Sequence, residues 1–592
     1  MIARTTKLRW RRRLKRQKQQ VEILSQKADN KLDRHFFKRI SSLIEVRRFV
    51  ISWVLLIALS ITGVWFQYRL LPSYYKQVTP TDGGIYTEGI LGTFTTANPV
   101  YATGPVDSAV ARLAFSGLME YDARGNLAGE LAEQITPNDK NDTYTIKLRD
   151  NIYWHDGRKI TSKDVVFTYQ LIQNPDSKSP LRSNWQGVKI AAPDARTVIF
   201  TIPHPLVSFP HSLTTGIVPE HLLNNISPAQ LRTADFNTNP VGSGPFQWES
   251  LVVQGQNPET REELVGLVAN EGYFKGRPKV DRIILRAVHD EKKLLELFND
   301  SQLTAATGLD NQTGSIDNSP SVREYDITLN GQVSVFFKTT QGDLTDVKVR
   351  QALVRAINKA DTLQSLGYPV ASSKTPFLPN HVGYNKEFAQ PGYDSNEANR
   401  LLDEAGWKKN DKGVREKDGR TLKFRLYAQK TNDFSNVAKN IQKQWKDAGV
   451  DAEVILLAPD ELQPVISEHS YDALLYGIEL GSDPDVYAYW HSSQADPRST
   501  NRLNFSEYKN AEADLALASG RSRGGELRAV KYQPFLRAWR DEAPALALYQ
   551  PRFYFVTRGK IFGFTDNAIN VPTDRYANIE NWQISTKQAT IK

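Results

Sequence analysis

The clearest alternation of apolar and polar positions in the chain lies at residues 144–148. A period of two predicts a β-strand with one buried face. The Asp-Gly pair at 156–157 then favours a tight turn, because glycine adopts positive φ without steric cost. Thr161 and Asp164 have the spacing of a capping box, so an amphipathic helix should begin there. The segment 144–172 is therefore predicted to form a strand, a turn and a helix, with structural roles for its polar residues.

The rest of the chain divides by its apolar pattern into two parts. Strand patterns dominate from residue 84 to about 335, whereas strands and helices alternate from residue 346 onward. Within the stretch 422–457, two short apolar runs flank a helix with one apolar face, formed by Val437, Ile441 and Trp445. This order predicts a βαβ unit and an α/β fold.

A long apolar run near the start of the sequence predicts a transmembrane helix. Phe49–Phe66 is uncharged, and a helix extended to Tyr68 would be about 30 Å long, close to the hydrocarbon thickness of a bilayer. The preceding residues 1–48 contain 16 Lys or Arg and 4 Asp or Glu, so this basic arm should stay cytoplasmic. A cleaved signal peptide is the alternative, but the arm and the apolar run are long for one, which favours an uncleaved signal anchor at 49–68. Proline and glycine then mark a linker at 69–83.

Composition excludes several classes of function. The sequence contains no cysteine, which excludes disulfides, thiolate catalysis and Cys-based metal sites. Its nine histidines are scattered, and the motifs of nucleophile elbows, phosphate loops and zinc proteases are missing, so we expect no catalytic residues, no metal site and no cofactor. Beyond the basic arm the chain has 59 basic and 62 acidic residues, which argues against nucleic-acid binding.

Five short motifs occur in an order that resembles one large family. The sequence is similar to the family 5 extracellular solute-binding proteins, the oligopeptide, dipeptide and nickel receptors of ABC importers. The motifs are LRDNIYWHDGRKITSKDVVFTY at 148–169, NPVGSGPF at 239–246, NEGYF with G-x-P-x-V-D at 270–281, VRQAL at 349–353 and LLDEAGW at 401–407. The resemblance covers nearly everything after the first ~80 residues.

The resemblance implies a two-lobed fold of the periplasmic-binding-protein kind, type II and of the large cluster C class, with mixed sheets. Lobe I would comprise residues 84–335 and 556–592, with a strand-rich subdomain at about 120–240, and lobe II would comprise 336–555. Two crossing strands would join the lobes near Phe336-Phe337 and Tyr554-Phe555. In this family the ligand is enclosed when the lobes close about that hinge.

The resemblance also points to a ligand-facing loop at residues 479–490, which follows an apolar strand. Peptide receptors of the family often carry an aspartate four residues before the proline of this loop, positioned to pair with the ligand's terminal ammonium. Leu480 occupies that position here, and Glu479 could replace the aspartate only if the strand end were bulged. Asp483 and Asp485 are either ligand contacts or turn and cap residues.

Further residues of the predicted site are aromatic or lie elsewhere in the sequence. Tyr487, Tyr489 and Trp490 would form either pocket walls or core. Asn98 belongs to an Asn-Pro turn that matches the family and is expected to border the cleft. Lys338 replaces the asparagine that relatives commonly carry after the crossover, and either attracts a carboxylate or lies on the surface.

Together these features predict a non-enzymatic, membrane-tethered receptor whose large C-terminal part is extracytoplasmic. It would be a monomer that binds a peptide or similar solute and delivers it to ABC permease subunits. Two alternatives stay open: a receptor for a metal chelate or other small solute, and a sensor or adhesin that uses the same fold.

Overall fold

The computed structural model describes residues 18, 21–23, 25, 47–74, 76–255, 261–309, 316–317, 319–499 and 502–590. These form two compact units, residues 1–79 with 586–592, and residues 80–585. Most of the basic arm predicted at 1–48 lies outside the described residues.

The first unit is dominated by helix α3 (Arg47–Tyr74), which contains the predicted membrane anchor. Its segment Phe49–Arg69 is long and apolar enough to cross a membrane, and none of its residues is buried. Strand β1 (Lys76–Thr81) pairs with β23 (Ser585–Thr590) in a two-stranded sheet. The segment 69–83, predicted as a linker, therefore contains the end of α3 and a strand.

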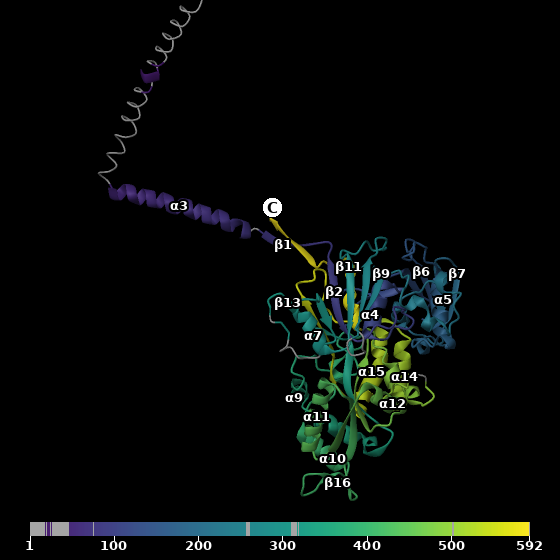
Figure 1. Cartoon of the computed structure of the whole chain (residues 1–592). Coiled ribbons are helices and arrows are strands. Elements are labelled where there is room, and N and C mark those ends of the chain that lie inside the picture. The colour runs from purple at the N-terminus through teal and green to yellow at the C-terminus, as the bar shows by residue number, and fades with distance from the viewer. Residues whose placement is uncertain are drawn as a thin grey trace, which may run out of the picture. The chain divides into compact units, whose positions relative to one another are not determined.

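The second unit contains a seven-stranded mixed sheet with the order β13-β22-β12-β2-β11-β10-β9 (Figure 1). Strand β2 is parallel to both of its neighbours, while the other pairs are antiparallel. Helices α4 (Pro105–Ala114) and α7 (Glu291–Asn299) pack against it. The strands are β2 (Ile85–Leu91), β9 (Phe246–Gln254), β10 (Glu262–Ala269), β11 (Arg282–Val288), β12 (Ala305–Thr307), β13 (Val322–Thr328) and β22 (Arg552–Arg558).

A four-stranded antiparallel sheet with the order β5-β6-β8-β7 forms a strand-rich subdomain with its own core. The predicted strand and helix are present in it as β6 (Thr143–Leu148) and α5 (Ser162–Gln173). The Thr161 N–H donates to the Asp164 carboxylate at 2.8 Å, as the capping-box spacing predicts. The remaining elements are β3 (Met119–Tyr121), β4 (Leu127–Gly129), β5 (Ala132–Pro137), β7 (Lys189–Asp194), β8 (Thr197–Thr201) and α6 (Glu220–Leu223). We call this subdomain and the seven-stranded sheet the first lobe.

The second lobe is built on a five-stranded sheet with the order β19-β18-β20-β14-β21. Its strands are β14 (Gly331–Phe337), β18 (Lys423–Gln429), β19 (Asp451–Leu457), β20 (Ala473–Glu479) and β21 (Ala545–Tyr549), and a small sheet contains β15 (Lys408–Lys409), β16 (Arg415–Lys417) and β17 (Arg420–Thr421). Its helices are α8 (Val347–Arg355), α9 (Lys359–Gln364), α10 (Ser395–Glu404), α11 (Asn432–Asp447), α12 (Pro459–Glu468), α13 (Tyr487–Trp490), α14 (Ala511–Arg521) and α15 (Gly525–Glu542) (Figure 1).

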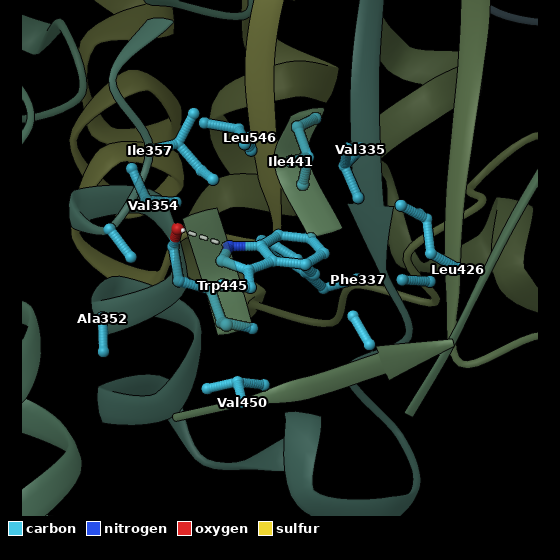
Figure 2. Packing of buried hydrophobic residues seen from close by; sticks show 14 of the residues in the cluster. Val335, Phe337, Ala352, Val354, Ile357, Leu426, Ile441, Trp445, Val450 and Leu546 are labelled. Atoms are coloured by element: carbon cyan, nitrogen blue, oxygen red, sulfur yellow. Dashed lines mark hydrogen bonds between the residues drawn. The ribbon is translucent and has the colours of Figure 1, made fainter. Parts of the chain in front are cut away.

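The βαβ unit predicted from the apolar pattern is β18-α11-β19, whose two strands are parallel. Trp445 of α11 is fully buried between α8 and the sheet, beside Phe337 and Ile441 (Figure 2). Its indole N–H donates to the Leu353 carbonyl at 3.0 Å, so the polar edge of the ring is satisfied inside the core.

The chain changes sheets at 329–330 and again at 550–551, which corrects the predicted crossovers. Residues 336–337 lie inside β14 of the second lobe, and residues 554–555 lie inside β22 of the first lobe. An apolar run has the same pattern whichever sheet it enters, so the runs could not show the boundary. The changes of sheet coincide instead with Asn330 and Pro551, which interrupt the runs.

Candidate ligand-binding site

A cavity of about 580 Å³ lies between the two sheets, beside both crossover segments. This volume is in the range of small-molecule and cofactor pockets, which is about 300–1,000 Å³. The first lobe contributes Leu91 and Gly308 from the ends of β2 and β12. The second lobe contributes the end of β20, including Glu479, and Asp433 and Phe434 from the first turn of α11.

Glu479 brings an uncompensated carboxylate to this cavity. Among the described residues its side chain has no hydrogen bond and no ion pair, and the residue is exposed to solvent within the open cavity. The surrounding cavity walls, and then the like charge of Asp574, raise the pKa of the Glu479 carboxyl. A positively charged ligand group is therefore the partner that this position would stabilise most.

The register of β20 with β14 is unbroken through Glu479, and an irregularity follows directly after it. The N–H groups of Leu480 and Gly481 both donate to the Asn330 carbonyl, each at 2.9 Å, and Gly481 has a φ of +68°. Two consecutive amides opposite one carbonyl are typical of a β-bulge. We call residues 480–481 the bulge. Leu480 is 8% exposed and belongs to the core, while Glu479 faces the cavity.

His381 holds the same loop from the second-lobe side. Burial lowers the pKa of His381 to about 4, so its ring is neutral at physiological pH. Its Nδ1 accepts the Leu378 N–H at 3.2 Å, and its Nε2 donates to the Gly481 carbonyl at 2.9 Å. Both ring nitrogens therefore serve to position the bulge.

The other charged groups of the cavity have partners inside the protein. The Tyr368 hydroxyl donates to the Asp433 carboxylate. The Arg552 guanidinium lies 3.4 Å from the centre of the Tyr368 ring and pairs with Asp326. These residues had no signal in the sequence, because their partners come from separate segments that only the fold brings together.

Asp483 forms a buried ion pair with Arg528 of α15. Its two carboxylate oxygens accept hydrogen bonds from Nη1 and Nη2 of Arg528 at 2.6 and 2.5 Å. The Arg528 side chain is 4% exposed. Asp483 also accepts the Asp485 N–H at 3.0 Å, as a turn-forming aspartate does. Both of its oxygens are thus engaged within the protein.

Asp485 connects the two lobes. Its carboxylate accepts from Arg521 at 2.8 Å and from the Ser208 hydroxyl of the strand-rich subdomain at 3.2 Å. A backbone bond from the Val207 N–H to the Arg521 carbonyl, at 3.0 Å, lies beside this contact. We call these contacts at 207–208 the inter-lobe contact.

The three aromatic residues of the predicted site are packed in the second lobe. Trp490 is 1% exposed and forms a T-shaped contact with Trp539. The Tyr487 ring stacks on the His491 ring, and the Arg521 guanidinium lies 4.2 Å from its centre. The Tyr489 hydroxyl donates to the Glu479 carbonyl at 2.8 Å and so helps to hold the strand end.

Asn98 and Lys338 are also buried. The Asn98 side chain donates to Asn237 at 3.1 Å and accepts the Val100 N–H at 3.1 Å, which stabilises its turn. The Lys338 ammonium donates to the His469 carbonyl at 2.7 Å and lies 4.0 Å from Glu507. Of the residues predicted for ligand contact, Glu479 is the one that lines the cavity.

Comparison with known proteins gives consistent matches over the region after the first helix. Residues 126–499 match the family model described as bacterial extracellular solute-binding proteins, family 5 middle. The oligopeptide-binding protein AppA of Bacillus subtilis is 28% identical over 523 residues, which cover 86% of this chain and 92% of AppA. A putative ABC transporter peptide-binding protein of Brucella melitensis is 31% identical over 510 residues, covering 84% and 92%.

Solved structures give the same result. The structure of Bacillus subtilis AppA in complex with a nonapeptide has a TM-score of 0.69 at 26% identity, and the match covers 86% of this chain and 100% of the AppA chain. NikZ of Campylobacter jejuni in complex with Ni(L-His) has a TM-score of 0.70 at 26% identity, with 84% and 99% covered. The two-lobed arrangement of mixed sheets is thus the fold of these binding proteins.

Proposed function

The chain belongs to the bacterial extracellular solute-binding proteins of family 5, and from this premise we propose that it captures a peptide between its lobes and delivers it to an ABC importer. The ligand class is supported by AppA, whose structure contains a nonapeptide, and by the Brucella peptide-binding protein. The activity is reversible binding without a bond-breaking step. Its partners are the permease subunits, and the receptor acts as a monomer.

The observation that carries the peptide proposal is the uncompensated Glu479 carboxylate in the cavity. A peptide amino terminus supplies the positive charge and the N–H donors that this group needs. Glu479 lines the cavity and is the neighbour of Leu480, the position where peptide receptors of this family often carry an aspartate. We therefore propose that Glu479 binds the ligand's terminal ammonium.

Lobe closure would be stabilised by the inter-lobe contact at Ser208 and Asp485. These residues belong to different lobes, so their hydrogen bond can form only when the lobes approach. A ligand that fills the cavity between them favours the same closed state, and the permease would recognise the surface that this state presents.

We further propose that α3 is an uncleaved signal anchor. Its apolar segment is long enough to span a bilayer, and the basic arm before it favours a cytoplasmic amino terminus. The receptor lobes would then be extracytoplasmic, where a solute-binding protein meets its ligand.

A metal-chelate receptor is the second candidate, because NikZ of the same fold was solved with a nickel–histidine complex. Over the described residues, no group of three or more metal-binding side chains is present, so nickel would have to arrive bound to a chelator.

The test is a thermal-shift experiment on the full-length protein in detergent. Pools of di- to decapeptides with free amino termini are compared with the same pools after amino-terminal acetylation and with nickel–histidine. At a hundredfold excess over Kd, a ligand adds about 2.7 kcal/mol of stability. We expect a rise in Tm with the free peptides and a smaller one with the acetylated peptides. A shift with nickel–histidine alone would replace the peptide proposal.

A further inference from the structure

Asn330 lies at the first crossover and uses all of its polar groups. It is 3% exposed. Its carbonyl accepts both amides of the bulge, and its N–H donates to the Ile569 carbonyl at 2.7 Å. Its side-chain Nδ2 donates to Asn570 Oδ1 at 2.8 Å, and its Oδ1 accepts from Asn380 Nδ2 at 3.4 Å.

These bonds join three segments that belong to different lobes. The bulge and Asn380 are in the second lobe. Ile569 is part of the core of the seven-stranded sheet, and the Asn570 N–H donates to Asp574 at 3.1 Å. Asn330 therefore connects the loop that carries Glu479 to the part of the first lobe that carries Asp574.

The electrostatic surroundings of Glu479 make this connection important. Its carboxylate has no partner among the described residues, and Asp574 repels it. Its position at the cavity therefore depends on how its backbone is held. Strand alternation puts Glu479 on the cavity side while Leu480 stays in the core, and the two amides of the bulge that follow are bonded to Asn330.

We propose that Asn330 is a positioning residue, which fixes Glu479 in the cavity by tying the bulge to residues 569–570 of the first lobe. This inference rests on the proposed function, in which Glu479 binds a peptide ammonium. Asparagine suits the position because it supplies one donor, to Asn570, and one acceptor, to Asn380. Alanine keeps the backbone bonds to the bulge and to Ile569 but supplies neither side-chain group.

The first test is a double-mutant cycle on the full-length protein in detergent, with Asn330→Ala, Glu479→Gln and the combination. The probe is a nonapeptide pool with free amino termini, with the acetylated pool beside it. Asn330→Ala removes the side-chain bonds to Asn570 and from Asn380, of which the second is long, and should weaken binding of the free pool by about threefold to tenfold. The loss should disappear in the Glu479→Gln background and with the acetylated pool.

A structural role alone would give a different pattern. Equal losses with both pools, or in both backgrounds, would overturn the proposal. Asn504→Ala is the matched control: Asn504 is fully buried and donates two side-chain hydrogen bonds, to the carbonyls of His491 and Tyr508. Asn504→Ala should lower Tm, but any change in affinity should be the same for the free and the acetylated pool. If Asn330→Ala does not fold, Asn570→Ala removes the same Nδ2 bond from the other side and should give the same pattern.

The second test needs no ligand and separates this inference from the proposed function. Carboxyl ¹³C NMR of glutamate-labelled protein follows the titration of Glu479, whose signal is identified by its loss in Glu479→Gln. Asn330→Ala should move the Glu479 pKa toward its ordinary value, because the carboxylate leaves the cavity wall and Asp574. An unchanged pKa would refute the positioning role even if peptides bind. If the pKa moves but no peptide binds to the wild type, the peptide proposal fails and the positioning role stands.

Discussion

Replacing Asp483 by asparagine distinguishes a structural role of this residue from the ligand contact that the sequence predicted. The Arg528 side chain is 4% exposed and the Asp483 side chain 15%, and two charge-assisted hydrogen bonds join them. Asp483→Asn keeps the shape but leaves a buried guanidinium without its counter-charge. Breaking a buried pair in this way costs about 3–5 kcal/mol.

This cost can be converted into a melting temperature. The unfolding entropy is about 2.1 cal/mol/K per residue, or about 1 kcal/mol/K for the compact unit Pro80–Ser585. Asp483→Asn should therefore lower Tm by about 3–5 °C in differential scanning calorimetry.

A compensating double variant supplies the control. In Asp483→Leu with Arg528→Met, both charges are replaced by apolar side chains of similar size, and most of the lost stability should return. Peptide affinity of the Asp483→Asn protein, measured well below its Tm, should stay within about twofold of the wild type. Unchanged Tm with a large loss of affinity would refute the reasoning and make Asp483 a ligand contact.

Three further predictions concern the cavity, the core and the anchor. Burial and Asp574 raise the Glu479 pKa, so the wild type should lose stability as pH rises above the ordinary glutamate pKa of about 4.3. The Tm of Glu479→Gln should equal that of the wild type near pH 4 and exceed it at pH 7, and this variant should bind free peptides more weakly. A Tm difference of the same size at both pH values would contradict this reasoning. Trp445→Phe removes the bond to the Leu353 carbonyl and leaves a void, so chemical denaturation should show a loss of about 2–3 kcal/mol, and a loss below 0.5 kcal/mol would contradict the packing of Figure 2. The full-length protein should stay in the membrane after alkaline carbonate extraction with an amino terminus before Phe49, and a terminus after Phe66 would show cleavage.

Local patterns in the sequence predicted local structure well. The alternation at 144–148, the Thr161 cap and the unit β18-α11-β19 depend on neighbours in the chain, and each is present. The predicted positions at which the chain changes sheets were wrong, because the apolar pattern of a strand does not depend on which sheet the strand joins. Leu480 departs from the family pattern, and ligand contact by Glu479 stays a prediction.

The partners of charged residues could not be predicted in the same way. Asp483 and Asp485 pair with arginines of α14 and α15, which lie far along the sequence, and nothing local indicates that pairing. Asn330 had no signal either, since its role depends on segments near residues 480 and 570 meeting at one point. The ligand-contact role of the aromatic residues at 487–490 stays a prediction, and in this structure their rings pack within the second lobe.

The order of strands in the seven-stranded sheet determines when each lobe can be completed during synthesis. The second lobe is contiguous, because all five strands of its sheet come from residues 331–549. In the first lobe, β13 has β22 as its sheet neighbour, and β22 also pairs with β12. More than two hundred residues must therefore be synthesised after β13 before its partner β22 is available for pairing. The lobe that begins first along the polypeptide is thus the one that finishes last, and until then its unpaired strand edge is the part of the nascent receptor most exposed to misassociation.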